Sequence, residues 1–314
     1  MGDTTTDLEL DAYRAELTGY CYRMLGSAFE AEDAVQEALL RAWKHGDRFE
    51  QRSSVRTWLY RITTNVCLDA LAARGRRVLP MDLTEPAVGA TSPGAPLDAA
   101  MWIEPCPYGD PAHAAAADES VRLAFVAALQ HLPPKQRATL LLREVMGFSA
   151  QEVAELHECS VASVNSALQR ARATLAARRA PDGESPAEPS GTVRSALARR
   201  YTAAFSRFDM EELGMLLHVD ATLSLPPYTV WMRGASDIRA WLSGPAVGCR
   251  GSRLVPVEAN GSPAFGQYRP AGATYAPWAL QVLDVRGDRV TAIHAFRDTE
   301  RLFPLFGLPE SIPA

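Results

Sequence analysis

The run from Ala31 to Arg77 constrains this chain more than any other part of it. It reads AEDAVQEALLRAWKHGDRFEQRSSVRTWLYRITTNVCLDALAARGRR. Apolar residues at helical spacing predict an acidic amphipathic helix that breaks at His45–Gly46–Asp47 and a second helix that carries Trp58. The second helix ends on a basic cluster. An acidic helix followed by a basic one suits a protein that bridges a protein partner and nucleic acid.

Charge is distributed unevenly along the 314 residues, although the formal net charge is only −5. Seven arginines against two acids lie between Arg48 and Arg77, and four arginines without an acid lie between Ser160 and Arg179. Between these two stretches, residues 78–119 contain seven acids and no Lys or Arg. Two basic regions that flank an acidic one are typical of a protein that contacts DNA twice.

The five cysteines are widely spaced and show no metal-ligand spacing, so we expect no metal site and no cofactor. Lone thiols fit a reducing cytoplasm. The N-terminus lacks the apolar segment of a signal peptide, and no stretch approaches the roughly 20 apolar residues of a membrane span. We therefore expect a cytoplasmic protein without a membrane partner.

Proline, glycine and alanine mark the boundaries between parts of the chain. Residues 8–77 and 118–179 show helical periodicity, with Pro133–Pro134 as a helix break in the second region. Residues 78–117 and 180–191 have linker composition, the first one acidic. Residues 192–314 combine two helical stretches with six strand-like runs, and a hairpin turn is expected at Arg286–Arg289.

One face of the first acidic helix mixes polar and apolar side chains. Asp33, Gln36 and Glu37 are neighbours at helical spacing, and Leu39, Leu40 and Trp43 lie beside them. Such a mixture is typical of a protein interface. The alternative is a solvated acidic face with a core tryptophan.

A helix-turn-helix is expected between Ser149 and Ala177. Ser149 with Glu152 forms a capping-box pattern, and Cys159–Ser160 is the predicted turn. Near the start of the second helix, Ser163, Asn165 and Ser166 are side chains that can bind base edges in a major groove.

These segments resemble the sigma-70 family, in particular the extracytoplasmic-function (ECF) sigma factors. DAVQEALLRAW and RTWLYRITTNVCLD resemble region 2, and LQHLPPKQRATLLLREVMGFS with SVNSALQRAR resembles region 4. Asn165 and Ala167 replace frequent basic residues of the region 4 pattern. The expected fold is multidomain, with two all-α sigma domains, a region 2 helical bundle and a region 4 helix-turn-helix, and an α+β cone.

The resemblance implies partners and site residues. It implies that core RNA polymerase binds through its beta-prime clamp helices and its beta flap, and that promoter DNA is read at −10 and −35 elements. The polymerase-binding residues would be Asp33, Gln36, Glu37, Leu39 and Trp43. The −10 residues would be Gln51, Arg52, Ser53, Ser54, Arg56, Arg61, Arg74, Arg76 and Arg77, although a solvated helix end is the alternative for the last three. The −35 residues would be Ser163, Asn165, Ser166, Gln169, Arg170 and Arg172.

The acidic linker resembles the segment that threads towards the polymerase active-site cleft in sigma factors. HVDATLSLPPYTVWMRGASDIRAWL and YAPWALQVLDVRGDRVTAIHAFRD resemble SnoaL-like domains, whose cone encloses a pocket. The candidate pocket residues, for a possible small ligand, are His218, Asp220, Tyr228, Trp231, Trp278 and His294.

The sequence thus predicts a non-enzymatic sigma factor whose C-terminal domain regulates it in cis. The alternative is a bifunctional protein whose C-terminal domain is a cyclase- or isomerase-type enzyme. A His–Asp pair inside the pocket would favour that alternative. A dimeric helix-turn-helix repressor would leave Ala31–Arg77 unexplained.

Overall fold

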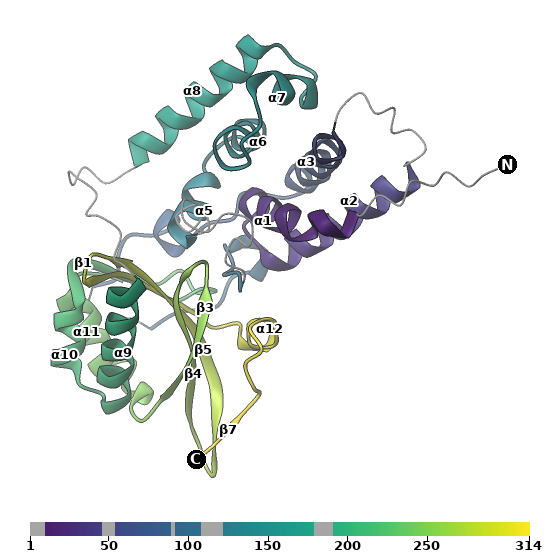
Figure 1. The fold of residues 1–314 in the computed structure, drawn as a ribbon. Coiled ribbons are helices and arrows are strands. Elements are labelled where there is room, and N and C mark those ends of the chain that lie inside the picture. Colours follow the sequence, from purple (N-terminus) through teal and green to yellow (C-terminus); the bar gives the residue numbers. More distant parts are fainter. Residues whose placement is uncertain (1–9, 46–53, 89–91, 108–121, 179–190) are drawn as a thin grey trace. The chain divides into compact units, whose positions relative to one another are not determined.

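The structure is a computed structural model that describes residues 10–45, 54–88, 92–107, 122–178 and 191–314. These residues form two compact units (Figure 1). The described residues up to 77 and from 122 to 178 form the first unit. Residues 78–107 join residues 191–314 in the second unit.

The first unit is built from helices whose ends follow capping rules. Ser27 and Ser54 cap the second and third helices, each accepting a hydrogen bond from a backbone N–H three residues on. Gly26 ends the first helix at φ 72°, a left-handed conformation that glycine adopts without strain. The helices of the N-terminal part are α1 (Arg14–Leu25), α2 (Ala28–Lys44) and α3 (Val55–Ala73).

The rest of the first unit contains the expected helix-turn-helix. The helices are α5 (Leu123–Leu129), α6 (Pro134–Leu140), a π-helical turn (Leu141–Val145), α7 (Ala150–Leu156) and α8 (Val161–Arg178). Arg137 on α6 is buried and donates to Gln130 Oε1 over 2.6 Å and to the Met24 carbonyl of α1. Burial lowers the pKa of Arg137 to about 10, with a further contribution from Arg74. These bonds connect the two helical parts of the unit.

The second unit is an α+β domain around one mixed sheet, as the sequence predicts. The sheet order is β2-β1-β6-β5-β4-β3, with β7 paired to β5; β1 and β6 are parallel and the other pairs are antiparallel. The strands are β1 (Leu217–Ser224), β2 (Trp231–Arg233), β3 (Arg253–Ala259), β4 (Ser262–Ala271), β5 (Thr274–Arg286), β6 (Arg289–Phe296) and β7 (Ile312–Pro313). Arg286 pairs with Arg289, which confirms the expected hairpin turn.

Helices cover the sheet of this domain. The helices are α9 (Gly191–Arg207), α10 (Met210–Leu216), α11 (Ala235–Ser243) and α12 (Thr299–Leu305). The main core lies between the first three and one face, with Tyr201, Leu223 and Ile293 buried in it. The other face carries Gly266, where an added Cβ would lie 2.7 Å from a methyl group of Leu308, just after α12. A larger residue at this position would therefore require the Leu308 side chain to move.

Residues 78–107, which composition assigns to a linker, are hydrogen-bonded to this domain. They contain two short 3₁₀ turns, Pro80–Asp82 and Ala99–Met101. Val78 and Trp102 form an isolated parallel bridge. Ala87 N–H donates to the Trp231 carbonyl over 2.7 Å. This segment therefore belongs structurally to the C-terminal unit.

Candidate protein and nucleic-acid interfaces

An exposed stripe runs along α2 at helical spacing. Asp33 and Gln36 are exposed, Leu40 is 43 % exposed and Trp43 is 71 % exposed. Positions i, i+3, i+7 and i+10 lie on one side of a helix. A tryptophan and a leucine exposed beside polar groups are typical of an interaction site. We call Asp33, Gln36, Leu40 and Trp43 the α2 stripe.

Two residues predicted for this surface lie differently. Leu39 is only 8 % exposed and packs in the helical core, because it is one position out of register with the stripe. Leu40, which the sequence places on this face but not among the polymerase-binding residues, takes the exposed place. Glu37 is half-buried and accepts a hydrogen bond from Arg41 Nε over 2.7 Å.

The predicted −10 residues separate into three groups: residues outside the described ranges, residues held by bonds inside the first unit, and exposed residues. Gln51, Arg52 and Ser53 lie outside the described residues. Ser54 caps α3 through its hydroxyl, so its side chain has a structural role. Arg61 and Arg76 are exposed, and Arg76 lies against the His131 ring. Trp58 is buried, as expected for a core residue rather than a stacking platform.

Arg56 is held inside the first unit. Its Nε donates to Glu16 over 2.9 Å and its Nη2 to the Met146 carbonyl over 2.9 Å. The guanidinium lies 4.4 Å from the centroid of the Phe148 ring, within cation–π range. Arg56 thus connects α3 to the segment before α7, and contact with DNA would require these bonds to break.

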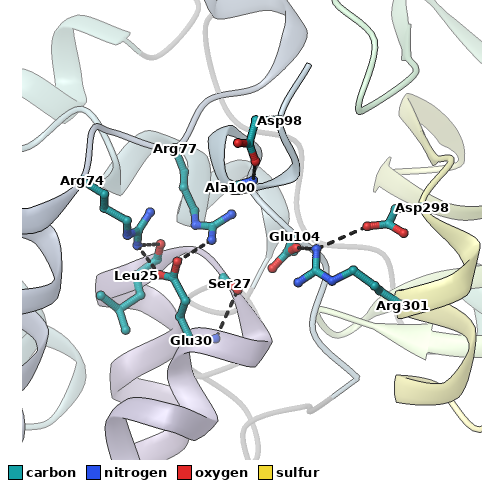
Figure 2. Close-up of polar contacts among 10 residues, drawn as sticks. All are labelled: Leu25, Ser27, Glu30, Arg74, Arg77, Asp98, Ala100, Glu104, Asp298 and Arg301. Carbon is teal, nitrogen blue, oxygen red and sulfur yellow. Dashed lines mark hydrogen bonds and ion pairs between the residues drawn. The ribbon is translucent and has the colours of Figure 1, made fainter. Parts of the chain in front are cut away.

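Arg74 and Arg77 both bind Glu30 at the start of α2 (Figure 2). Arg74 Nη2 lies 2.6 Å from Glu30 Oε2, and Arg77 Nη2 lies 2.7 Å from Oε1. Arg74 also donates to the Leu25 carbonyl over 2.8 Å. Arg77 is buried, so this ion-pair cluster fastens the end of α3 to α2. The sequence suggested phosphate contacts or a solvated helix end, and the structure shows neither for these two residues.

The helix-turn-helix is organised as predicted. Ser149 and Glu152 form a reciprocal capping box at α7, and the Ser160 hydroxyl accepts from the Ser163 N–H at the start of α8. Hydrogen bonds from the Ser149 backbone and hydroxyl lower the pKa of Glu152. Val153, Leu156, Val164 and Leu168 are among the buried residues that join the two helices.

All six predicted −35 residues lie exposed on α8. They are Ser163, Asn165, Ser166, Gln169, Arg170 and Arg172. Arg172 Nε donates to Glu144 over 2.6 Å, but its side chain remains 63 % exposed. The other five place polar and basic groups on one side of α8. In a helix-turn-helix, the second helix is the one that lies in the major groove.

A cavity lies between α9, α11 and the inner face of the C-terminal sheet. Its walls are largely apolar, with Phe205, Leu225 and Ile293 among them. A buried hydrogen-bond chain runs from Tyr201 to Gln281 and on to Gln267, both steps at 2.8 Å. The cavity is lined by Tyr201, Phe205, Leu223, Leu225, Trp241, Leu242, Cys249, Gln267, Trp278, Ala279, Gln281, Ile293, Ala295 and Arg297.

Of the predicted pocket residues, Trp278 alone lines this cavity. His218 and Asp220 are exposed on β1, because the chain enters the strand at Leu217 instead of continuing the helix. Tyr228 is half-buried at the margin of the core. Trp231 is buried, and its Nε1 donates to the Thr84 carbonyl over 2.8 Å.

His294 lies on the opposite face of the sheet from the cavity. Its neighbours in the strand, Ile293 and Ala295, line the cavity, and alternate residues of a strand point to opposite faces. His294 Nδ1 lies 2.9 Å from Ser224 Oγ, and Nε2 lies 3.4 Å from Asp284 Oδ2. The His–Asp pair that would favour an enzyme therefore exists, but away from the cavity.

Over the residues that the structure describes, no group of three or more His, Cys, Asp or Glu side chains could hold a metal ion. Within those same ranges, no helix is long and apolar enough to cross a membrane.

Comparisons with known proteins agree with this organisation. The family model of sigma-70 region 2 matches residues 10–77, and that of sigma-70 region 4 matches residues 122–175. The ECF RNA polymerase sigma factor SigG of Mycobacterium tuberculosis is 45 % identical over 309 residues, which cover 96 % of this chain and 83 % of SigG. The probable ECF sigma factor SigI of that organism is 27 % identical, with coverage of 94 % and 93 %.

A solved structure has the same overall fold. It is the crystal structure of the M. tuberculosis ECF sigma factor SigJ, with a TM-score of 0.61 and 24 % identity. The match covers 96 % of this chain and 99 % of SigJ. The likeness therefore extends over both sigma regions and the C-terminal domain.

Proposed function

Because this chain belongs to the sigma-70 family and is an ECF sigma factor with a C-terminal α+β domain, we propose that it directs core RNA polymerase to promoters through the surfaces described above. The observation that carries the proposal is the presence in one chain of the α2 stripe and the exposed polar face of α8. Its place of action would be the cytoplasm, with the polymerase.

The α2 stripe is the proposed contact with the beta-prime clamp helices. Trp43 and Leu40 supply apolar area, and Asp33 and Gln36 supply polar groups around it. Interfaces depend mostly on a few large side chains of this kind. The beta flap is the proposed partner of the helix-turn-helix part, by resemblance to region 4.

Promoter reading is assigned to two exposed sets. Asn165, Ser166 and Gln169 on α8 would contact base edges of the −35 element, and Arg170 and Arg172 would contact phosphates or bases. Among the described −10 residues, Arg61 is exposed and available for contact, whereas Arg76 is exposed but would have to leave the His131 ring. DNA contact by Arg56, Arg74 and Arg77 would require the helices of the first unit to rearrange and the internal bonds of these residues to break.

The C-terminal domain is proposed to regulate activity in cis, and its cavity, with an interior volume of about 20 Å³, to widen around a small ligand. Apolar walls would select an apolar ligand, and Trp241 Nε1 is a buried donor to which no hydrogen bond is assigned among the described residues. Arg297 at the wall would favour an acceptor or anionic group; burial lowers the pKa of Arg297. The described cavity lining contains no His, Asp or Glu side chain that could act as a general acid or base.

Run-off transcription tests the proposal. Purified core polymerase and this protein would be incubated with genomic promoter fragments, and discrete transcripts that depend on the protein are expected. Stable binding to core polymerase without any promoter-dependent transcript from the whole genome would contradict promoter-directed initiation.

A further inference from the structure

The described residues 78–88 and 92–107, which we call the strap, are attached near both edges of the C-terminal sheet. Near the β2 edge, Trp231 and the 226–229 loop bind Thr84, Ala87 and Leu97 through hydrogen bonds of 2.7–2.9 Å. At the other edge lies the turn between β4 and β3, which binds Cys106. A tether that only joins two domains would not need specific bonds at opposite edges of a sheet.

The Cys106 attachment is reciprocal. Asn260 donates its backbone N–H to the Cys106 carbonyl over 2.9 Å and accepts the Cys106 N–H on Oδ1 over 3.0 Å. Asn260 is fully buried and occupies a left-handed conformation, φ 55°, ahead of Gly261. Asn-Gly suits a two-residue hairpin turn. Here the Asn260 side chain also accepts a backbone N–H of the strap, as the carbonyl of a neighbouring strand would.

The C-terminal end of the strap is buried and carries a charged side chain. Residues 102–106 are all buried, with Ile103 at 0 % and Trp102 at 2 % exposure. Glu104 is 6 % exposed and accepts from Arg301 Nη1 on α12 over 2.9 Å (Figure 2). A buried carboxylate needs such a partner, so the strap is specified by charge as well as by backbone bonds.

We propose that the C-terminal domain binds the strap in competition with core RNA polymerase, so that release of the strap is the step through which this domain regulates initiation. The inference rests on the proposed function, together with the resemblance of this segment to the sigma segment that threads towards the polymerase active-site cleft. When a binding-competent form is only partly populated, the apparent affinity falls by that fraction. A docked strap would therefore weaken polymerase binding by the ratio of total protein to protein with a free strap.

The chain carries a chemical probe of docking. Cys106 is a buried thiol in the strap that forms no disulfide, Cys159 is exposed in the helix-turn-helix, and Cys249 is buried in the C-terminal core. Alkylation of each thiol in the full-length protein can be followed by peptide mass spectrometry. Cys106 is expected to react slowly, Cys159 rapidly, and Cys249 slowly as long as the domain is folded.

Two variants loosen the strap by different means. Asn260→Gly removes the side-chain acceptor and keeps a residue that tolerates positive φ. Arg301→Gln removes the charge opposite Glu104. Each is expected to speed Cys106 alkylation about tenfold, with Cys249 still protected. Arg286→Gln, an exposed arginine outside these attachments, is the matched control and should leave the Cys106 rate unchanged.

Polymerase affinity then decides the competition. The loosened variants should bind core polymerase more tightly, up to the factor by which Cys106 alkylation accelerates, and should give more run-off transcript. Faster alkylation with unchanged polymerase affinity would overturn the competition, and unchanged alkylation in both variants would overturn the docked strap. If the wild-type protein did not bind core polymerase, both the proposed function and the competition would be contradicted. The alkylation rates would then still test whether the strap is docked.

Discussion

Trp43 is the residue whose exposure is hardest to explain without a partner. It is 71 % exposed on a helix whose opposite side is well buried. Trp43→Ala is expected to weaken core polymerase binding about thirtyfold, the factor that about 2 kcal/mol represents for a central aromatic contact. The thermal unfolding of the protein should hardly change. Titration of labelled core polymerase measures the affinity.

The matched control is Met215→Ala, which removes a large apolar side chain that is 56 % exposed on α10. It should leave polymerase affinity at the wild-type value. Wild-type affinity in Trp43→Ala as well would refute the α2 stripe as the docking surface.

Asn165 and Arg172 should differ in what they contribute to DNA binding. Asn165→Ala is expected to relax base preference at one −35 position and to cost about 1–3 kcal/mol if the lost contact is bidentate. Arg172→Ala should weaken binding evenly across sequences and flatten its salt dependence. Promoter-library selection and salt titration measure the two effects. An unchanged −35 preference in Asn165→Ala would show that α8 is read in another register.

The arginines show what residue type alone cannot predict. Arg74, Arg76 and Arg77 form one basic cluster in the sequence, but two of them bind Glu30, which lies more than forty positions earlier. Composition locates basic residues, whereas their partners depend on which helices pack together. The exposed α8 residues were predictable because helical spacing and local caps determine their exposure.

At the scale of elements, the capping box of α7 supports the helix-turn-helix. Ser149→Ala is expected to destabilise α7 by about 1 kcal/mol, because two backbone N–H groups lose their side-chain partner or its orientation. Hydrogen exchange of the α7 amides should accelerate several-fold while α9 amides keep their rates. Equal exchange in α7 of both proteins would contradict a stabilising cap.

The same box has a pH dependence with a definite sign. Hydrogen bonds from Ser149 lower the pKa of Glu152 in the folded protein. The stabilisation is therefore fully present above the ordinary carboxyl pKa and is lost as the pH falls through the lowered value. Acidification should speed α7 exchange, after correction for intrinsic rates, more in wild type than in Glu152→Gln. An equal acid response of the two proteins would show that Glu152 does not contribute.

Sequence periodicity predicted the helices and strands well and their long-range partners poorly. The hairpin at Arg286–Arg289 and the turn at Cys159–Ser160 follow from local signals. The strap does not, because Thr84 binds Trp231, 147 positions away. Proline and glycine indicate that a segment lacks regular secondary structure. A docked irregular segment and a free linker both lack it, so composition does not distinguish them. The Trp102 side chain, unusual in linker composition, was the one local sign of burial.

At the scale of the molecule, one compact unit contains both the C-terminal domain and the segment that lies between the two sigma regions in sequence. The described strap residues belong to the C-terminal unit, although sequence order places them between regions 2 and 4. A domain held in cis acts at an effective concentration of about millimolar, so weak bonds suffice to hold the strap. Regulation can thus act on a sigma segment without a separate protein.

Truncation before Gly191 removes the domain and leaves the strap without its partner. The strap then loses its hydrogen bonds with Trp231 and Asn260 and the ion pair between Glu104 and Arg301, so this region should become the preferred site of limited proteolysis. Core polymerase binding should persist, because the α2 stripe is intact, and run-off transcription should change. Full-length protein mixed with the same amount of protease is the control. Equal transcription by truncated and full-length protein on the native promoter, across salt and temperature, would show that the C-terminal domain is not regulatory and would return attention to its cavity as a small-molecule site.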